Sequence, residues 1–124
     1  MENKDSDPDE VPVIEAILSK EELIVYLTAY PPNIEGETYL EWAKPHPGFA
    51  DSLMKVGEIR TKNFKMENDQ YWGADAPIDF SRYPYARINI YQLKSSSKLY
   101  FKYRETGGHM PEQRVRLIRR ELIV

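Results

Sequence analysis

Few side chains in this sequence could carry acid–base chemistry near neutral pH. There are two histidines, His46 and His109, and His46 stands five residues before Asp51. Asp75 and Asp79 follow in the segment GADAPID, so a histidine–aspartate site or a carboxylate pair could assemble in three dimensions. Neither histidine has the spacing of a metal site or a catalytic triad, and the Pro and Gly residues beside them are typical of loops.

The familiar sequence motifs of catalytic sites are missing from the chain. It has no Walker motif, no dinucleotide-binding glycine pattern and no nucleophile elbow. It also has no cysteine, which excludes disulfides, a thiolate nucleophile and cysteine-ligated metals. We therefore expect a protein that is not an enzyme and that holds no cofactor or metal.

A different chemistry is indicated by residues 85–105, YARINIYQLKSSSKLYFKYRE, where apolar residues alternate with rings and cations. The alternation predicts two antiparallel strands joined by a Ser-rich turn. Pairing Ile90 with Phe101 and Ile88 with Tyr103 gathers the apolar side chains on one face. The burial of each such side chain contributes about 1.5–3 kcal/mol, which favours this register.

A register shifted by one residue would instead pair Arg87 with Glu105. That surface ion pair contributes only about 0–1 kcal/mol, so apolar sorting should prevail even though it sets Arg87 against Arg104. The other face of the hairpin should then expose rings and cations to a binding partner. We predict a binding surface that combines this hairpin face with two residues of a long loop and two of a later strand. Its residues are Tyr71, Trp72, Tyr85, Arg87, Tyr91, Tyr100, Lys102, Arg104, Arg114 and Arg116.

The long loop is residues 68–84, NDQYWGADAPIDFSRYP, which show no clear period. Irregular connections of this length are often functional in compact domains. Its rings have two interpretations: they either pack onto the core and hold the loop in place, or Tyr71 and Trp72 are exposed anchors for a partner.

The N-terminal half gives weaker signals. In residues 11–30 the β-branched and aromatic content favours two strands around a SKEE turn, against a helix that a Ser19–Glu22 capping box could begin. Thr38 and Glu41 form a second possible capping box before a short helix that Pro45 would stop.

Two further segments complete the predicted elements. Residues 51–55 could form a helical turn, followed by a strand over residues 58–66. Residues 112–124 fit a strand somewhat better than a helix, with a bulge near Ile118, and a strand would add Arg114 and Arg116 to the basic sheet face.

Length and composition are consistent with one small α+β domain. The chain has 124 residues, 41% of them hydrophobic and 30% charged, which is typical of a well-solvated globular protein. We expect an acidic, flexible tail at residues 1–10 and a single domain at 11–124, with a mostly antiparallel sheet and one or two short helices. No signal peptide or membrane span is evident, so we expect a cytoplasmic protein.

Charge is divided unevenly along the sequence. Residues 1–80 contain 17 acidic and 7 basic side chains, and residues 81–124 contain 3 acidic and 10 basic ones. The basic-aromatic sheet face and the aromatic loop favour a small non-catalytic protein-binding module, such as an inhibitor, immunity protein, adaptor or assembly factor. The first alternative is a protein that binds single-stranded nucleic acid, and the second is a small enzyme with a His/Asp site.

Overall fold

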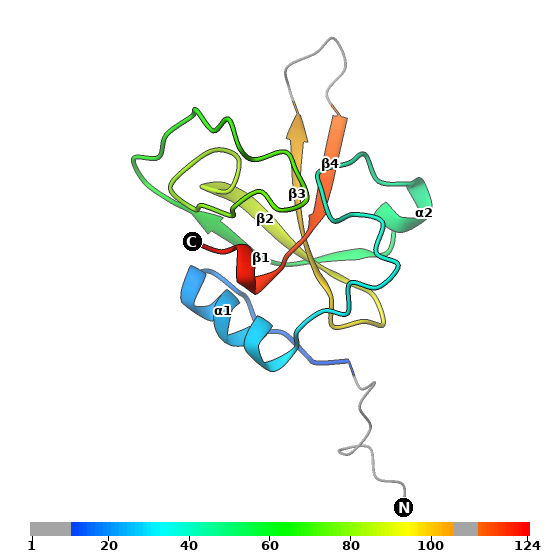
Figure 1. Ribbon diagram of the computed structural model, residues 1–124. Coiled ribbons are helices and arrows are strands. Elements are labelled where there is room, and N and C mark those ends of the chain that lie inside the picture. The colour runs from blue at the N-terminus through cyan, green and yellow to red at the C-terminus, as the bar shows by residue number, and fades with distance from the viewer. Residues whose placement is uncertain (1–10, 106–111) are drawn as a thin grey trace, which may run out of the picture.

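A four-stranded antiparallel sheet forms the centre of the computed structural model, which describes residues 11–105 and 112–124. The strands are β1 (Leu53–Arg60), β2 (Arg87–Leu93), β3 (Leu99–Glu105) and β4 (Glu112–Leu117), and they lie in that order in the sheet. Helix α1 (Lys20–Ala29) lies across one side of the sheet, and the short helix α2 (Pro47–Ala50) lies near β4 (Figure 1). The predicted α+β fold is confirmed. The predicted tail at residues 1–10 lies outside the described residues.

The register of the β2–β3 hairpin follows apolar sorting. Ile90 pairs with Phe101, and Asn89 pairs with Lys102. Ile88, Ile90 and Phe101 are all buried on one face, which we call the inner face of the sheet. The predicted register is therefore confirmed, and the irregular connection predicted between residues 68 and 84 is also found.

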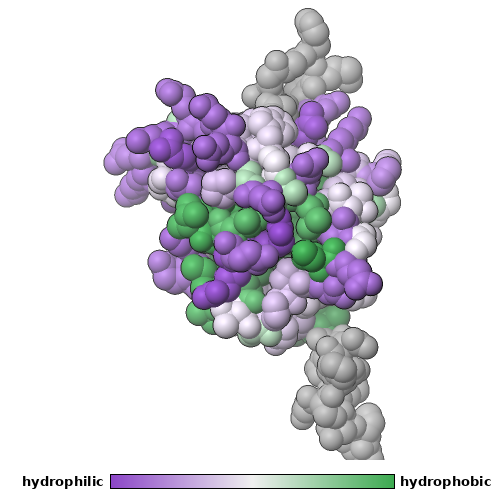
Figure 2. Space-filling view, in the orientation of Figure 1, coloured by the Kyte–Doolittle hydropathy of each residue, from purple (hydrophilic) through white to green (hydrophobic). Residues whose placement is uncertain are grey.

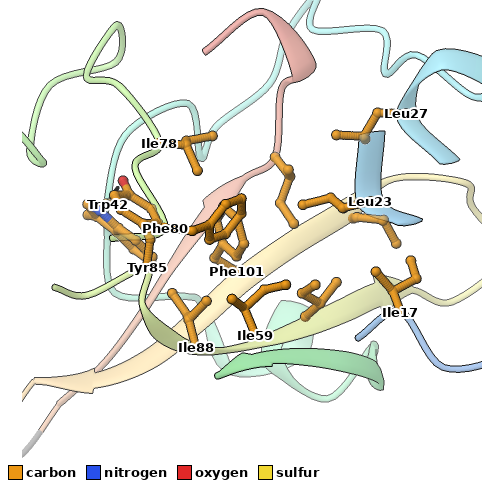
Figure 3. Close-up of a cluster of buried hydrophobic side chains, with 13 residues drawn as sticks. Ile17, Leu23, Leu27, Trp42, Ile59, Ile78, Phe80, Tyr85, Ile88 and Phe101 are labelled. Atoms are coloured by element: carbon orange, nitrogen blue, oxygen red, sulfur yellow. Dashed lines mark hydrogen bonds between the residues drawn. The ribbon is translucent and has the colours of Figure 1, made fainter. Parts of the chain in front are cut away.

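The main hydrophobic core lies on the inner face. Figure 3 shows Ile59 and Ile88 rising from the strands toward Phe80 and Phe101, while Leu23 and Leu27 approach from α1. Phe80 belongs to the connection between β1 and β2, and its ring meets that of Phe101 edge-on at 5.9 Å between centroids. We call residues 61–86, between β1 and β2, the long connection. Helix α1 and the long connection thus cover the inner face together.

A second, smaller core lies on the outer face. Tyr100, Val115 and Leu117 are buried there beneath Tyr39 and the ring of Phe49 in α2. The backbone of residues 39–43 also pairs with β4, since Ala43 bridges Val115. This cover reaches only one end of the outer face and leaves the other end open.

Helix α1 replaces the two strands predicted for residues 11–30, so that prediction is wrong. Ser19 is the N-cap: its hydroxyl accepts from Glu22 N at 3.1 Å, and the Glu22 carboxylate accepts from Leu18 N at 2.9 Å. Leu23 and Leu27 are one helical turn apart and both are buried. Capping and burial outweigh the low helix propensity of the β-branched residues.

The other local predictions in the N-terminal half are wrong or only partly correct. Residues 38–42 form no helix, because this segment is extended and lies beside β4. Helix α2 begins at Pro47, where proline suits the first helical position. The strand predicted at residues 58–66 is β1, which begins and ends earlier, at Leu53–Arg60.

The C-terminal segment forms a strand, as predicted, but without the expected bulge. Strand β4 ends at Leu117, and a short 3₁₀ turn, η2 (Arg120–Leu122), follows. Ile123 then bridges Ile78 of the long connection. No helix in the described part of the chain has the length and apolar content needed to cross a membrane.

Candidate functional site

Cationic side chains from three strands gather on the open end of the outer face. The register sets Lys55 opposite Tyr91, Arg60 opposite Arg87, and Asn89 opposite Lys102. We call this surface the basic face. Its members are Lys55, Glu58, Arg60, Arg87, Asn89, Tyr91, Lys102 and Arg104.

Arg60 is held in place at this surface by several acceptors. Its guanidinium donates to the carbonyl oxygens of Ile59 at 2.8 Å and Ile88 at 3.1 Å, and to the Asn89 side chain at 2.9 Å. The single carboxylate of the basic face, Glu58, accepts from the Lys55 ammonium at 2.9 Å. That hydrogen bond, together with the charge of Arg60, holds the pKa of Glu58 below its ordinary value.

Arg87 and Arg104 are the exposed cations of the basic face that have no acidic partner among the described residues. They line a hollow of about 210 Å³ together with Arg60 and Lys102. The β1–β2 register sets Arg87 opposite Arg60, and Arg104 lines the same hollow. Like charges placed this way destabilise a sheet, and an anionic group bound between them would relieve the repulsion.

Tyr91 stays on the basic face, but one side of its ring is occupied. The Lys102 ammonium lies 4.3 Å from the ring centroid, which is a cation–π contact. The side chain is half-buried rather than open. Of the predicted binding residues, Arg87, Tyr91, Lys102 and Arg104 therefore do lie together at the surface.

Tyr85 and Arg116 were predicted on the exposed face, and that placement is wrong. Both are fully buried: the β3–β4 register sets Arg116 opposite Phe101 on the inner face, and Tyr85 packs in the main core. The Arg116 guanidinium donates to the Tyr85 hydroxyl at 2.5 Å, and Trp42 Nε1 donates to the same oxygen at 3.0 Å. Burial raises the pKa of Tyr85, although the neighbouring Arg116 opposes the shift.

Backbone carbonyl groups complete the coordination of Arg116. It donates to the carbonyl oxygens of Leu40 at 3.2 Å, Ala74 at 3.0 Å and Ala76 at 2.8 Å. No carboxylate pairs with it in the part of the chain that the structure describes. Through these hydrogen bonds Arg116 holds the long connection against β4. Arg119 donates to the Ala74 carbonyl as well.

Tyr100 is also buried, contrary to the prediction. Its hydroxyl donates to Glu37 Oε1 at 2.9 Å, and the Lys98 ammonium lies 3.2 Å from the same oxygen. Burial, with the Glu37 charge beside it, raises the pKa of Tyr100. The cover from residues 37–49 therefore removes this ring from the candidate surface.

Trp72 and Tyr71 begin a row of rings that leads to the basic hollow. Trp72 is 43% exposed and lies 4.6 Å from Tyr71, centroid to centroid. Tyr71 meets Tyr83 at 6.0 Å, and Tyr83 meets Tyr103 at 5.9 Å. Tyr83 and Tyr103 both line the hollow. We call these four residues the aromatic row.

The sequence pattern does not identify Tyr83 and Tyr103 as site residues. It predicts Tyr103 on the inner face, which is correct, but at the end of β3 that face also borders the hollow. Arg114 was predicted on the basic sheet face and instead pairs opposite Tyr103, with its guanidinium carbon 5.9 Å from the Trp72 ring. No local pattern in the sequence signals either position.

The acid–base candidates are not brought together. His46 is the exposed N-cap of α2, and no hydrogen bond or ion pair joins its imidazole to a carboxylate in the described residues. Asp79 accepts from the Ser81 side chain and backbone, and this bonding lowers its pKa. His109 lies outside the described residues. Among the residues that are described, no cluster of three or more acidic or histidine side chains could hold a metal.

Comparison with protein-family models, with curated proteins and with solved structures finds no match for this chain.

Proposed function

We propose that this protein is a small non-catalytic module that binds another protein, of acidic surface, through the basic face. The observation that carries the proposal is the hollow that Arg87 and Arg104 line without an acidic partner in the described residues. A carboxylate group presented by the partner would fit between the two guanidinium groups, and complementary charge would speed the encounter.

The aromatic row adds apolar contact area beside the hollow. Trp72 is the most exposed of its rings, and tryptophan, tyrosine and arginine are the residues most enriched at energetic centres of protein interfaces. Arg114 and Tyr71 both lie against Trp72, so the indole needs little ordering when a partner binds.

Single-stranded nucleic acid remains the alternative partner. Stacking of bases requires open rings, yet Tyr85 and Tyr100 are buried and Lys102 occupies one side of Tyr91. The net charge of −3 is also far from the strongly basic character of most nucleic-acid-binding domains. These observations favour a protein partner. The enzyme alternative has no supporting contact in the described residues.

Affinity capture from an extract of the native host tests the proposal. The tagged wild type is compared with Arg87→Glu plus Arg104→Glu and with a matched control, Lys94→Glu plus Arg120→Glu. Lys94 and Arg120 are exposed and lie outside the basic face, so both double variants change the net charge equally. After nuclease treatment, we expect an acidic protein that the wild type and control retain and the Arg87/Arg104 variant loses by at least about tenfold.

Two results would count against this function. Capture that nuclease abolishes would support the nucleic-acid alternative. Capture that the Arg87/Arg104 variant retains as well as the wild type would place the interaction elsewhere on the molecule.

A further inference from the structure

Helix α1 carries apolar side chains on its solvent side as well as on its buried side. Leu23 and Leu27 are buried in the main core, whereas Val25 between them is 69% exposed. The preceding segment adds Val13 and Leu18, which are 98% and 59% exposed. A helix that only covers a core is expected to be polar on its outer side. Neighbouring exposed apolar side chains are typical of interaction surfaces.

Val13 and Val25 border a groove between residues 12–17 and α1, which we call the apolar groove. It has a volume of about 290 Å³, and its apolar lining includes Val13, Ile14, Val25, Ala29 and Tyr30. The segment that forms one wall is fixed to the sheet, because Ile17 is buried and its backbone bridges Gly57 of β1. The groove is therefore present without a partner.

The charged groups that line the apolar groove are all acidic. They are Glu15 and Glu22, and no basic side chain lines it among the described residues. Glu22 accepts from Leu18 N and the Ser19 hydroxyl through one oxygen. Glu15 is exposed and has no partner in the described part of the chain. An apolar floor beside unpaired negative charge is complementary to a leucine-like side chain flanked by lysine or arginine.

We propose that the apolar groove is a second docking surface, which receives an apolar side chain from a basic segment of a partner protein. Figure 2, in the orientation of Figure 1, shows hydrophobic patches exposed between polar ones on the side where α1 lies. The apolar groove shares no residue with the basic face, and the two surfaces select partners of opposite charge. The inference does not depend on the function proposed for the basic face.

A labelled amphipathic peptide of leucine and lysine, about 14 residues long, tests this site by fluorescence anisotropy. Two analogues of equal length replace its leucines by serine or its lysines by glutamate. The leucine–lysine peptide should bind the full chain at least about tenfold more tightly than either analogue, since both apolar contact and charge are required.

Matched variants locate the binding. Val25→Ser should weaken the leucine–lysine peptide at least about fivefold, whereas Val124→Ser, at a 61% exposed site outside the groove, should not. Glu15→Gln should weaken it less, in proportion to the lost charge. Amide hydrogen exchange should slow within residues 12–30 when the peptide is bound.

Three results would overturn the proposal. The serine–lysine peptide could bind as tightly as the leucine–lysine peptide, which would indicate attraction by charge alone. Val25→Ser could bind the peptide as the wild type does. Sedimentation could show a dimer of the free protein that Val25→Ser dissociates, in which case a second copy occupies the groove.

Discussion

Gly57 lies where the backbone of Ile17 pairs in parallel with β1, and at this position the close contact requires glycine. A Cβ atom added to Gly57 would lie 2.1 Å from the Ile17 carbonyl oxygen, much closer than atoms can approach. Gly57→Ala should therefore lower the free energy of unfolding by about 1–3 kcal/mol, measured by urea denaturation.

Gly48 in α2 provides the matched control for that substitution. A Cβ atom there meets nothing within 4 Å, so Gly48→Ala should leave stability unchanged or raise it by up to about 1 kcal/mol. Equal stability of the two variants would mean that the segment before α1 does not pair with β1.

Arg116 is expected to be a stability residue rather than a binding residue. Arg116→Met would keep much of the buried volume but leave the Ala76 carbonyl without its side-chain donor. The Tyr85 hydroxyl would keep only its bond from Trp42, and the Ala74 carbonyl only its bond from Arg119. We expect a loss of at least about 2–3 kcal/mol in the free energy of unfolding. Tyr85→Phe should cost about 1–3 kcal/mol, and the double variant should cost less than the sum. Strictly additive effects would contradict the direct contact.

The roles of these buried residues could not be predicted from the sequence. The alternation of apolar and polar residues predicts the inward side chains of the hairpin correctly, because successive side chains of a strand point to opposite faces. It could not show that residues 37–49 cover Tyr100, or that the long connection covers Tyr85. Those contacts join segments far apart in the chain, and no local pattern records them.

At the scale of elements, the β1–β2 pair carries a like-charge repulsion that a single substitution can remove. Arg87→Glu would place a carboxylate opposite Arg60 and so form a cross-strand ion pair. We expect the free energy of unfolding to rise by about 0.2–1 kcal/mol, by urea denaturation, while partner capture weakens. A less stable Arg87→Glu variant would contradict a repulsion between the guanidinium groups of Arg60 and Arg87.

Element types were predictable where tertiary contacts agree with local preference. The hairpin satisfies apolar sorting, turn residues and strand propensity together. Helix α1 does not: its β-branched residues favour a strand, and the Ser19–Glu22 capping box with two buried leucines decides otherwise. The sequence predicts strand β4 correctly, but it does not predict which face Arg116 lies on. That depends on the register with β3, which places Arg116 on the inner face.

At the scale of the whole molecule, tyrosine ionisation should set the alkaline limit of stability. Burial, with Tyr30 nearby, raises the pKa of Tyr26 to about 12, against about 10 in an unfolded chain. The folded state thus keeps a proton that the unfolded state releases. This contribution is complete below about pH 10 and is lost as the pH rises from about 10 to 12.

Tyr26→Phe isolates that contribution. The variant loses the hydrogen bond to the Ser97 carbonyl, 2.6 Å in the wild type, and should be less stable at neutral pH. Its stability should nevertheless fall less steeply above about pH 10 than that of the wild type, as measured by urea denaturation across that range. Parallel curves for the two proteins would contradict the raised pKa.

We propose that apolar sorting leaves Arg87 and Arg104 open to an acidic protein partner. The most direct test is the dissociation constant of the purified partner, measured calorimetrically at two salt concentrations. We expect Arg87→Glu plus Arg104→Glu to bind at least about tenfold more weakly and with less dependence on salt, while Lys94→Glu plus Arg120→Glu stays near the wild type. Equal weakening by both double variants, or by neither, would contradict it.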